Sequence, residues 1–305
     1  MVAMALSGCA SYWLLYPGMA ESTDPHLDPA ASGNQYEVIQ VTNANRVSLK
    51  GWLFAKPGDR GTALILGGNA MNISATYAQS RYLIGSGFRV LIFTWQGFDT
   101  NGGAAELVSL LGDANAFYVH AQSHFPGEPI AFVGYSTGAV TGICLGAKEP
   151  LKAIVVEGTF NPKTIVDDRH MWLAKPLEGM FVAGIPDDLD TARCLQEIKL
   201  TPILFVHNRD DTLAPYDAAR RLFDGYQGPK EFLDTKKLDS SQAHMGSAFD
   251  AAAQAKILAF LKQSLTRSDT SAAASTNGTG YRALPPPEAH RRHGMPRRLT
   301  IAIIR

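Results

Sequence analysis

The sequence lacks several features that would point to particular partners or compartments. Its 28 Lys and Arg balance 28 Asp and Glu, and this neutral charge gives no support for binding nucleic acid or an acidic surface. No apolar run approaches the ~20 residues that a membrane-spanning helix needs. Its three cysteines, Cys9, Cys144 and Cys194, are too few for a disulfide framework, and no C-x-x-C pair predicts a metal site. We expect Cys144 to be a small core residue.

The composition and the apolar pattern instead predict a globular α/β protein. The 305 residues are 46% hydrophobic and 18% charged, as is typical of soluble enzymes. Period-two alternation over residues 36–56 predicts an antiparallel hairpin. Apolar strands predicted at 63–66, 89–93, 129–133, 152–156, 202–206 and 231–238 alternate with helices, among them 72–84, 104–124 and the closing helix 249–265. This alternation predicts a doubly wound, mostly parallel eight-stranded sheet with helices on both faces.

The stretch around Ser136 is the strongest local signal in the chain. A buried strand at 129–133 runs into Gly-Tyr-Ser-Thr-Gly (134–138), and small residues follow at the start of a helix. A G-x-S-x-G turn between strand and helix holds its serine in a strained conformation with the hydroxyl exposed at the edge of the sheet. We therefore interpret Ser136 as a nucleophile, against the alternative of a glycine turn with an incidental serine.

A serine nucleophile needs a base, and the base needs an acid that orients it. The carboxyl ends of parallel strands share one edge of the sheet, so the partners should follow the later strands. Asp211 follows the seventh strand, and His244 lies in the loop after the eighth. The adjacent Asp210 is the alternative acid. The chain order serine, acid, histidine matches that of the α/β-hydrolase architecture.

Competing sites lack residues that their chemistry requires. His120 and His124 lie four residues apart on a predicted helix, but Ala121 occupies the position where a zinc protease carries glutamate. No dinucleotide or phosphate loop is present. We therefore expect no metal and no cofactor.

The negative charge that develops on an acyl substrate requires two preorganised N–H donors. We expect one from the backbone of Thr137, directly after the nucleophile. We expect the other from the loop after the third strand, residues 67–70, with the N–H of Asn69 as the candidate.

Taken together, these motifs resemble the α/β-hydrolase superfamily, over about residues 36–265. Within it, the Gly-Gly-Asn-Ala-Met-Asn stretch from residue 67 is similar to the His-Gly-Asn-Ala-Gly-Asn loop of the depalmitoylase-like serine hydrolases. Val-Glu-Gly-Thr-Phe at 156–160 is similar to their Glu-x-x-Phe segment. Two positions depart from that pattern, because Gly67 replaces the histidine and Met71 replaces the second glycine. The triad positions Ser136, Asp211 and His244 match.

The resemblance implies a serine hydrolase that cleaves a small-molecule ester, thioester or amide through an acyl-enzyme, with a carboxylic ester as the first expectation. The altered oxyanion loop motivates an alternative, which is a non-catalytic or weakly catalytic lipid- or partner-binding lipoprotein on the same fold.

One long segment, residues 160–199, has no strand character and is predicted to form a small helical cap above the strand ends. Its large apolar residues include Trp172, Met180 and Phe181. These side chains either pack down on the sheet or line a pocket for the acyl chain. We predict the pocket.

The two ends of the chain differ in character from the body. Leu-Ser-Gly-Cys at 6–9 resembles a bacterial lipobox, which makes Cys9 a candidate for lipidation and membrane attachment in the cell envelope. No Lys or Arg precedes it, so the alternatives are a truncated signal or an accidental match in a cytoplasmic protein. We predict a leader and tether over 1–35, a hydrolase domain over 36–268 and a disordered tail over 269–305.

Overall fold

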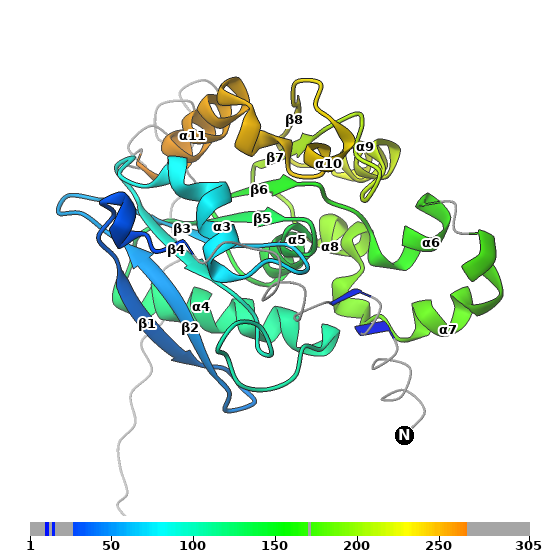
Figure 1. Ribbon diagram of the computed structural model, residues 1–305, viewed down its shortest axis with the longest axis horizontal. Helices are drawn as coiled ribbons and strands as arrows, with labels where there is room; N and C mark the ends of the chain where they lie inside the picture. The colour runs from blue at the N-terminus through cyan, green and yellow to red at the C-terminus, as the bar shows by residue number, and fades with distance from the viewer. Residues whose placement is uncertain (1–9, 12–13, 16–26, 170–171, 267–305) are drawn as a thin grey trace, which may run out of the picture. The chain divides into compact units, whose positions relative to one another are not determined.

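The computed structural model describes residues 10–11, 14–15, 27–169 and 172–266, all within one compact unit. Its centre is an eight-stranded sheet (Figure 1). The strands are β1 (Glu37–Thr42), β2 (Ser48–Phe54), β3 (Thr62–Leu66), β4 (Arg89–Phe93), β5 (Ile130–Tyr135), β6 (Ala153–Glu157), β7 (Ile203–His207) and β8 (Lys230–Asp234). They lie in the order β1-β2-β4-β3-β5-β6-β7-β8.

The sheet is antiparallel only at one edge. β1 pairs with β2, and β2 pairs with β4, in antiparallel fashion, and every later pairing is parallel. The predicted hairpin and the predicted mostly parallel sheet are therefore confirmed. Because the parallel strands share a direction, the loops after β3, β5, β7 and β8 all begin at the same edge of the sheet.

Helices cover both faces of the sheet. The helices on one face are α4 (Leu110–His124), α5 (Thr137–Lys148), α8 (Thr191–Glu197) and α9 (Tyr216–Gly225), and those on the other are α3 (Ile73–Ser80) and α11 (Ala251–Leu265). The central strand β3 shows why two layers are needed. Leu64 and Leu66 belong to the core on the first face, whereas Ala63 and Ile65 belong to the core on the second. A strand buried on both faces is apolar at successive positions.

Three element boundaries differ from the predicted ones by more than two residues. The predicted helix 104–124 begins as a short 3-10 turn η3 (Leu107–Ser109) and becomes α4 at Leu110. The predicted helix 72–84 ends as α3 at Ser80, and another 3-10 turn, η2 (Arg81–Leu83), follows. The last strand ends at Asp234 rather than at 238, because the Lys236 N–H donates 2.7 Å to the Asp250 carboxylate instead of extending the ladder.

The predicted cap segment is helical, but its parts lie in different places. It contains η4 (Pro162–Thr164), α6 (Ile165–Asp168), η5 (Trp172–Leu177), α7 (Glu178–Ala183), η6 (Asp187–Leu189) and α8. α6 and α7 extend beyond the end of the sheet at the right of Figure 1. α8 instead lies beside α5 in the helix layer, so the part of the segment that extends from the body is shorter than residues 160–199.

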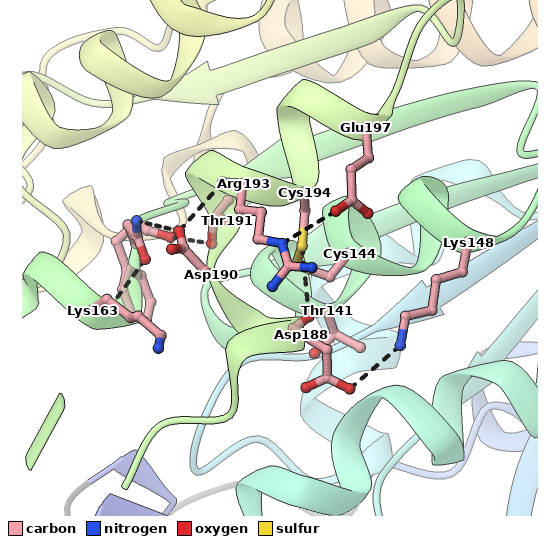
Figure 2. The surroundings of a disulfide bond; sticks show 12 residues. Thr141, Cys144, Lys148, Lys163, Asp188, Asp190, Thr191, Arg193, Cys194 and Glu197 are labelled. Atoms are coloured by element: carbon pink, nitrogen blue, oxygen red, sulfur yellow. Dashed lines mark hydrogen bonds and ion pairs between the residues drawn. A yellow bond between two sulfur atoms is a disulfide. The ribbon is translucent and has the colours of Figure 1, made fainter. Parts of the chain in front are cut away.

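A disulfide joins α5 to α8. Cys144 and Cys194 are bonded, with their Cα atoms 5.0 Å apart, and both residues are buried (Figure 2). The interpretation of Cys144 as only a small core residue was therefore wrong, although its burial was correct. Cys194 comes 50 positions after Cys144, and β6 and the α6–α7 segment lie between them, so the sequence does not indicate that α5 and α8 are neighbours.

Parts of the predicted leader and tether are in contact with the body. Ala10 and Leu15 belong to the hydrophobic core, and Ser11 Oγ accepts the Leu107 N–H at 3.0 Å. In the tether, Asn34 Nδ2 donates to the Tyr77 hydroxyl at 2.8 Å. No helix within the described part of the chain is long and apolar enough to span a membrane.

Candidate active site

Ser136 occupies a strained turn between β5 and α5. Its φ of 53° and ψ of −116° lie where a non-glycine residue is rarely found. The flanking glycines allow the turn to be this tight. A Cβ at Gly134 would lie 2.3 Å from the Gly138 carbonyl oxygen, and one at Gly138 would lie 2.4 Å from the Leu66 carbonyl oxygen. The turn therefore has the geometry of a nucleophile elbow.

The structure brings Ser136, His244 and Asp211 together from three separate loops. His244 Nε2 lies 2.8 Å from Ser136 Oγ, and His244 Nδ1 lies 2.8 Å from Asp211 Oδ2. The carboxylate selects the tautomer with the proton on Nδ1, which leaves Nε2 as an acceptor for the serine hydroxyl. This is the arrangement of nucleophile, base and orienting acid that acyl transfer requires.

The Asp211 carboxylate is fixed on both oxygens. Oδ1 accepts the backbone N–H groups of Leu213 and Ala214 at 2.8 and 2.9 Å, while Oδ2 faces His244. Burial works to raise the pKa of Asp211, but the hydrogen bonds and the nearby histidines hold it below its usual value. The carboxylate is therefore ionised at neutral pH. Asp210, the alternative acid, is exposed, and its backbone N–H donates to Asn208 Oδ1.

A second histidine, His207, lies beside Asp211 and was not predicted as a site residue. His207 ends β7 with its side chain buried, its Nε2 2.7 Å from the Ala214 carbonyl oxygen and 3.5 Å from Asp211 Oδ2. Burial lowers its pKa, against the attraction of Asp211, so the ring is neutral at pH 7. The sequence did offer one sign of this residue, because His207 is a polar residue at the end of an apolar strand, four residues before Asp211.

The loop after β3 lies against Ser136. A Cβ at Gly68 would be 2.9 Å from Ser136 Cβ, so this position contacts the serine directly. A Cβ at Gly67 would lie 2.3 Å from Thr76 Oγ1, which explains why the position carries no side chain. Asn69, the predicted donor, is the residue after Gly68. Thr137, the other predicted donor, is the first residue of α5, where a helix has no internal partner for its N–H.

The predicted acyl-pocket residues have different surroundings. Met180 is 53% exposed on α7. Phe181 is partly buried against the hydrophobic core on the face of the sheet that α4 and α5 cover. The side chain of Trp172 lies outside what the structure describes, as does Cys9. Beside β2 and the end of β4, a cavity of about 320 Å³ is lined by Tyr36, Trp52 and nine further residues, none of which is a predicted site residue.

The described residues contain no group of three or more His, Cys, Asp or Glu side chains arranged to hold a metal ion. His120 and His124 stack on each other on α4, with ring centroids 3.9 Å apart. His124 Nδ1 lies 2.9 Å from the His120 carbonyl oxygen. The pair is therefore explained by local helix contacts.

Comparisons with known proteins agree with this architecture. No family model matches the chain. It is 26% identical over 202 residues to the uncharacterized protein Rv2307c of Mycobacterium tuberculosis, covering 64% of this chain and 69% of that protein. The Pyrococcus furiosus esterase Pf2001 superposes with a TM-score of 0.63 at 18% identity, covering 80% of this chain and 96% of the esterase. The α/β hydrolase GrgF from Penicillium superposes with a TM-score of 0.56 at 17% identity, covering 76% of this chain and all of that one. These likenesses, with the strand order and the elbow, show that the chain has the α/β-hydrolase fold.

Proposed function

We propose that this protein is a serine hydrolase that cleaves a carboxylic ester, or a related thioester or amide, through an acyl-enzyme. One observation carries the proposal. The imidazole of His244 lies 2.8 Å from both Ser136 Oγ and Asp211 Oδ2, at an elbow whose backbone is held in a strained conformation. The fold of an esterase with a TM-score of 0.63 supports this reading of the geometry.

The proposed reaction has two halves. Ser136 Oγ attacks the acyl carbon while His244 Nε2 takes the hydroxyl proton, and a tetrahedral intermediate forms. The intermediate collapses when the bond to the leaving group breaks and His244 returns the proton to that group. Water then attacks the acyl-serine by the same route and releases the acid and free Ser136. Asp211 stays ionised throughout and stabilises the imidazolium.

The oxyanion of the intermediate needs donors on the side of the elbow that faces the β3 loop. We assign them to the backbone N–H groups of Thr137 and Asn69. The support is that Thr137 begins α5 directly after the nucleophile and that Gly68, the neighbour of Asn69, touches Ser136.

For the substrate, we propose a small molecule with an apolar acyl chain, as a depalmitoylase-like enzyme would use. Phe181 and Met180 of α7, together with Trp172, are the proposed acyl-chain contacts. Their support is that the α6–α7 segment follows β6, which runs parallel to β5, so this segment begins at the same edge of the sheet as Ser136. The chemistry needs no metal or cofactor.

We propose the bacterial cell envelope as the location, with membrane attachment through a lipidated Cys9. The lipobox-like sequence at 6–9 supports this, and so does the disulfide between Cys144 and Cys194, because such bonds persist mainly in oxidising compartments.

A fluorophosphonate probe tests the proposed activity, because it reacts only with an activated serine. The parent protein should be labelled on Ser136, and Ser136→Ala and His244→Ala should not be labelled. A panel of p-nitrophenyl esters of increasing chain length then gives the acyl preference. A folded parent that neither reacts with the probe nor hydrolyses any ester would instead support the non-catalytic binding function.

A further inference from the structure

A second buried carboxylate lies beside the triad. Glu157 is the last residue of β6, and it is 2% exposed at the end of an otherwise apolar strand. A charged side chain in such a position is costly unless hydrogen bonds compensate its burial. The contacts of Glu157 show where that compensation comes from.

The backbone of Glu157 holds the nucleophile. Its carbonyl oxygen accepts the Ser136 N–H at 2.8 Å, directly at the residue whose φ is positive. The next residue, Gly158, lies against the base, since a Cβ there would be 2.7 Å from the His244 carbonyl oxygen and 3.1 Å from its Cε1. The end of β6 therefore contacts both Ser136 and His244.

The side chain of Glu157 holds the loop that carries the histidine. Oε1 accepts the Ser247 N–H at 2.7 Å, and Oε2 accepts the Ser247 hydroxyl at 2.5 Å. Ser247 comes three residues after His244. Gln79 Nε2 donates 3.1 Å to the Met245 carbonyl oxygen, which gives the same loop a second, weaker attachment to α3. The Glu157 carboxylate thus ties this loop to the end of β6 through two hydrogen bonds.

Burial has the largest effect on the ionisation of Glu157. Burial raises its pKa to about 7, opposed by the hydrogen bonds from Ser247. The ionisable groups that act on it are His244, Asp211 and the buried phenols of Tyr82 and Tyr135. Asp211 already occupies His244 Nδ1, so Glu157 does not replace the acid.

We propose that Glu157 is a positioning residue, which rigidly links the nucleophile elbow to the histidine loop so that His244 Nε2 stays within reach of Ser136 Oγ. This inference rests on the proposed hydrolase function. If the link is lost, the loop can move away from the elbow while the substrate pocket keeps its shape. A misplacement of about 1 Å caused by a residue outside the chemistry costs up to about 10²-fold in rate. The loss should therefore fall on kcat and leave KM nearly unchanged.

Three variants test the link by steps. Glu157→Ala removes both bonds to Ser247 and should lower kcat for p-nitrophenyl acetate by roughly 10²-fold. Glu157→Gln keeps an acceptor for the Ser247 N–H and should recover most of that loss. Ser247→Ala keeps the backbone bond only and should fall between the parent and Glu157→Ala.

Asp113→Ala is the matched control. Asp113 is also a fully buried carboxylate with a raised pKa, but its partners are Asn43, which follows β1, and the N–H of Gln96, which follows β4. Asp113→Ala should lower the melting temperature and leave kcat close to that of the parent.

The outcomes separate this inference from the proposed function. A folded parent that the fluorophosphonate does not label overturns the proposed function itself. A labelled parent, with Glu157→Ala folded and kcat unchanged, overturns only the positioning role. A Glu157→Gln variant that is as slow as Glu157→Ala also overturns the positioning role, because the charge of Glu157 would then matter rather than its hydrogen bonds. If Glu157→Ala does not fold, Ser247→Ala decides, and an unchanged kcat in that variant overturns the link.

Discussion

The thioether sulfur of Met71 lies 3.0 Å from the backbone nitrogen of Gly68 and accepts its hydrogen bond. The Met71 N–H in turn donates to the Gly68 carbonyl oxygen at 3.2 Å, so the two residues close a tight turn. Ala70, inside this turn, has a positive φ of 62°. Because Gly68 also touches Ser136, the sulfur fixes the loop that we propose to supply an oxyanion donor.

We predict that Met71→Leu lowers kcat for p-nitrophenyl acetate by roughly tenfold, with KM nearly unchanged. Leucine fills the space of methionine but cannot accept the Gly68 N–H, so the loop loses its internal restraint. Loss of a whole oxyanion donor costs about 10²–10³-fold, and loosening one should cost less. Steady-state kinetics with matched melting temperatures measure the effect. A leucine variant with the parent's kcat would show that the sulfur only fills space.

The meeting of Ser136, Asp211 and His244 could be predicted from the sequence. Apolar strands alternating with helices predict parallel strands, and parallel strands bring the residues after β5, β7 and β8 to one edge. That reasoning predicts that Ser136, Asp211 and His244 come together, as the structure shows. Met71 was different, because the sequence showed only a departure from a family pattern. The hydrogen bond from the Gly68 N–H to the Met71 sulfur depends on the shape of a turn. Such a turn leaves no periodic pattern in the sequence.

Two contacts between distant segments could not be predicted from the sequence, for a different reason. Glu157 and Ser247 are 90 residues apart, and Cys144 and Cys194 are 50 apart. Each pair depends on how neighbouring elements pack, whereas the strand pattern gives only the class and order of the elements. A glutamate at the end of an apolar strand was a visible anomaly, but its partner was not.

The two adjacent aspartates should differ sharply in their effect on the rate. Asp211→Asn should lower kcat by about 10⁴-fold, because the amide favours the wrong tautomer of His244. Asp210→Asn is the control, since Asp210 is exposed, and its kcat should stay within about twofold of the parent's. Comparing the two variants in the same ester assay decides the assignment. A larger loss for Asp210→Asn would transfer the role of the acid to that residue.

Asp113 should make the protein less stable as the pH rises. Burial raises its pKa from an ordinary 3.8 to about 6, against hydrogen bonds from the Gln96 N–H and Asn43. Between these values the folded state holds more protons than the unfolded state, so the free energy of unfolding falls with increasing pH. The full effect is roughly 3 kcal/mol, at 1.36 kcal/mol for each pKa unit.

Urea unfolding at several pH values between 4 and 7 measures this dependence. Asp113→Asn cannot ionise, so its unfolding free energy should fall less steeply than that of the parent over the same window. Glu157 adds a decrease of the same sign up to pH 7, and both proteins share it. Parallel pH profiles for the two proteins would contradict the raised pKa of Asp113.

Removing the disulfide should destabilise the fold without altering the chemistry. The bond between Cys144 and Cys194 closes a loop of about 50 residues, for which chain entropy gives roughly 4 kcal/mol. In a domain of this size that corresponds to a lower melting temperature on the order of 10 °C. Cys144→Ala/Cys194→Ala should show this shift and keep the parent's kcat below its own melting temperature, because neither cysteine touches the triad. Dithiothreitol should lower the melting temperature of the parent but not that of the double variant. A parent that is insensitive to the reductant, with a double variant that melts at the same temperature as the parent, would mean that the bond adds nothing to stability.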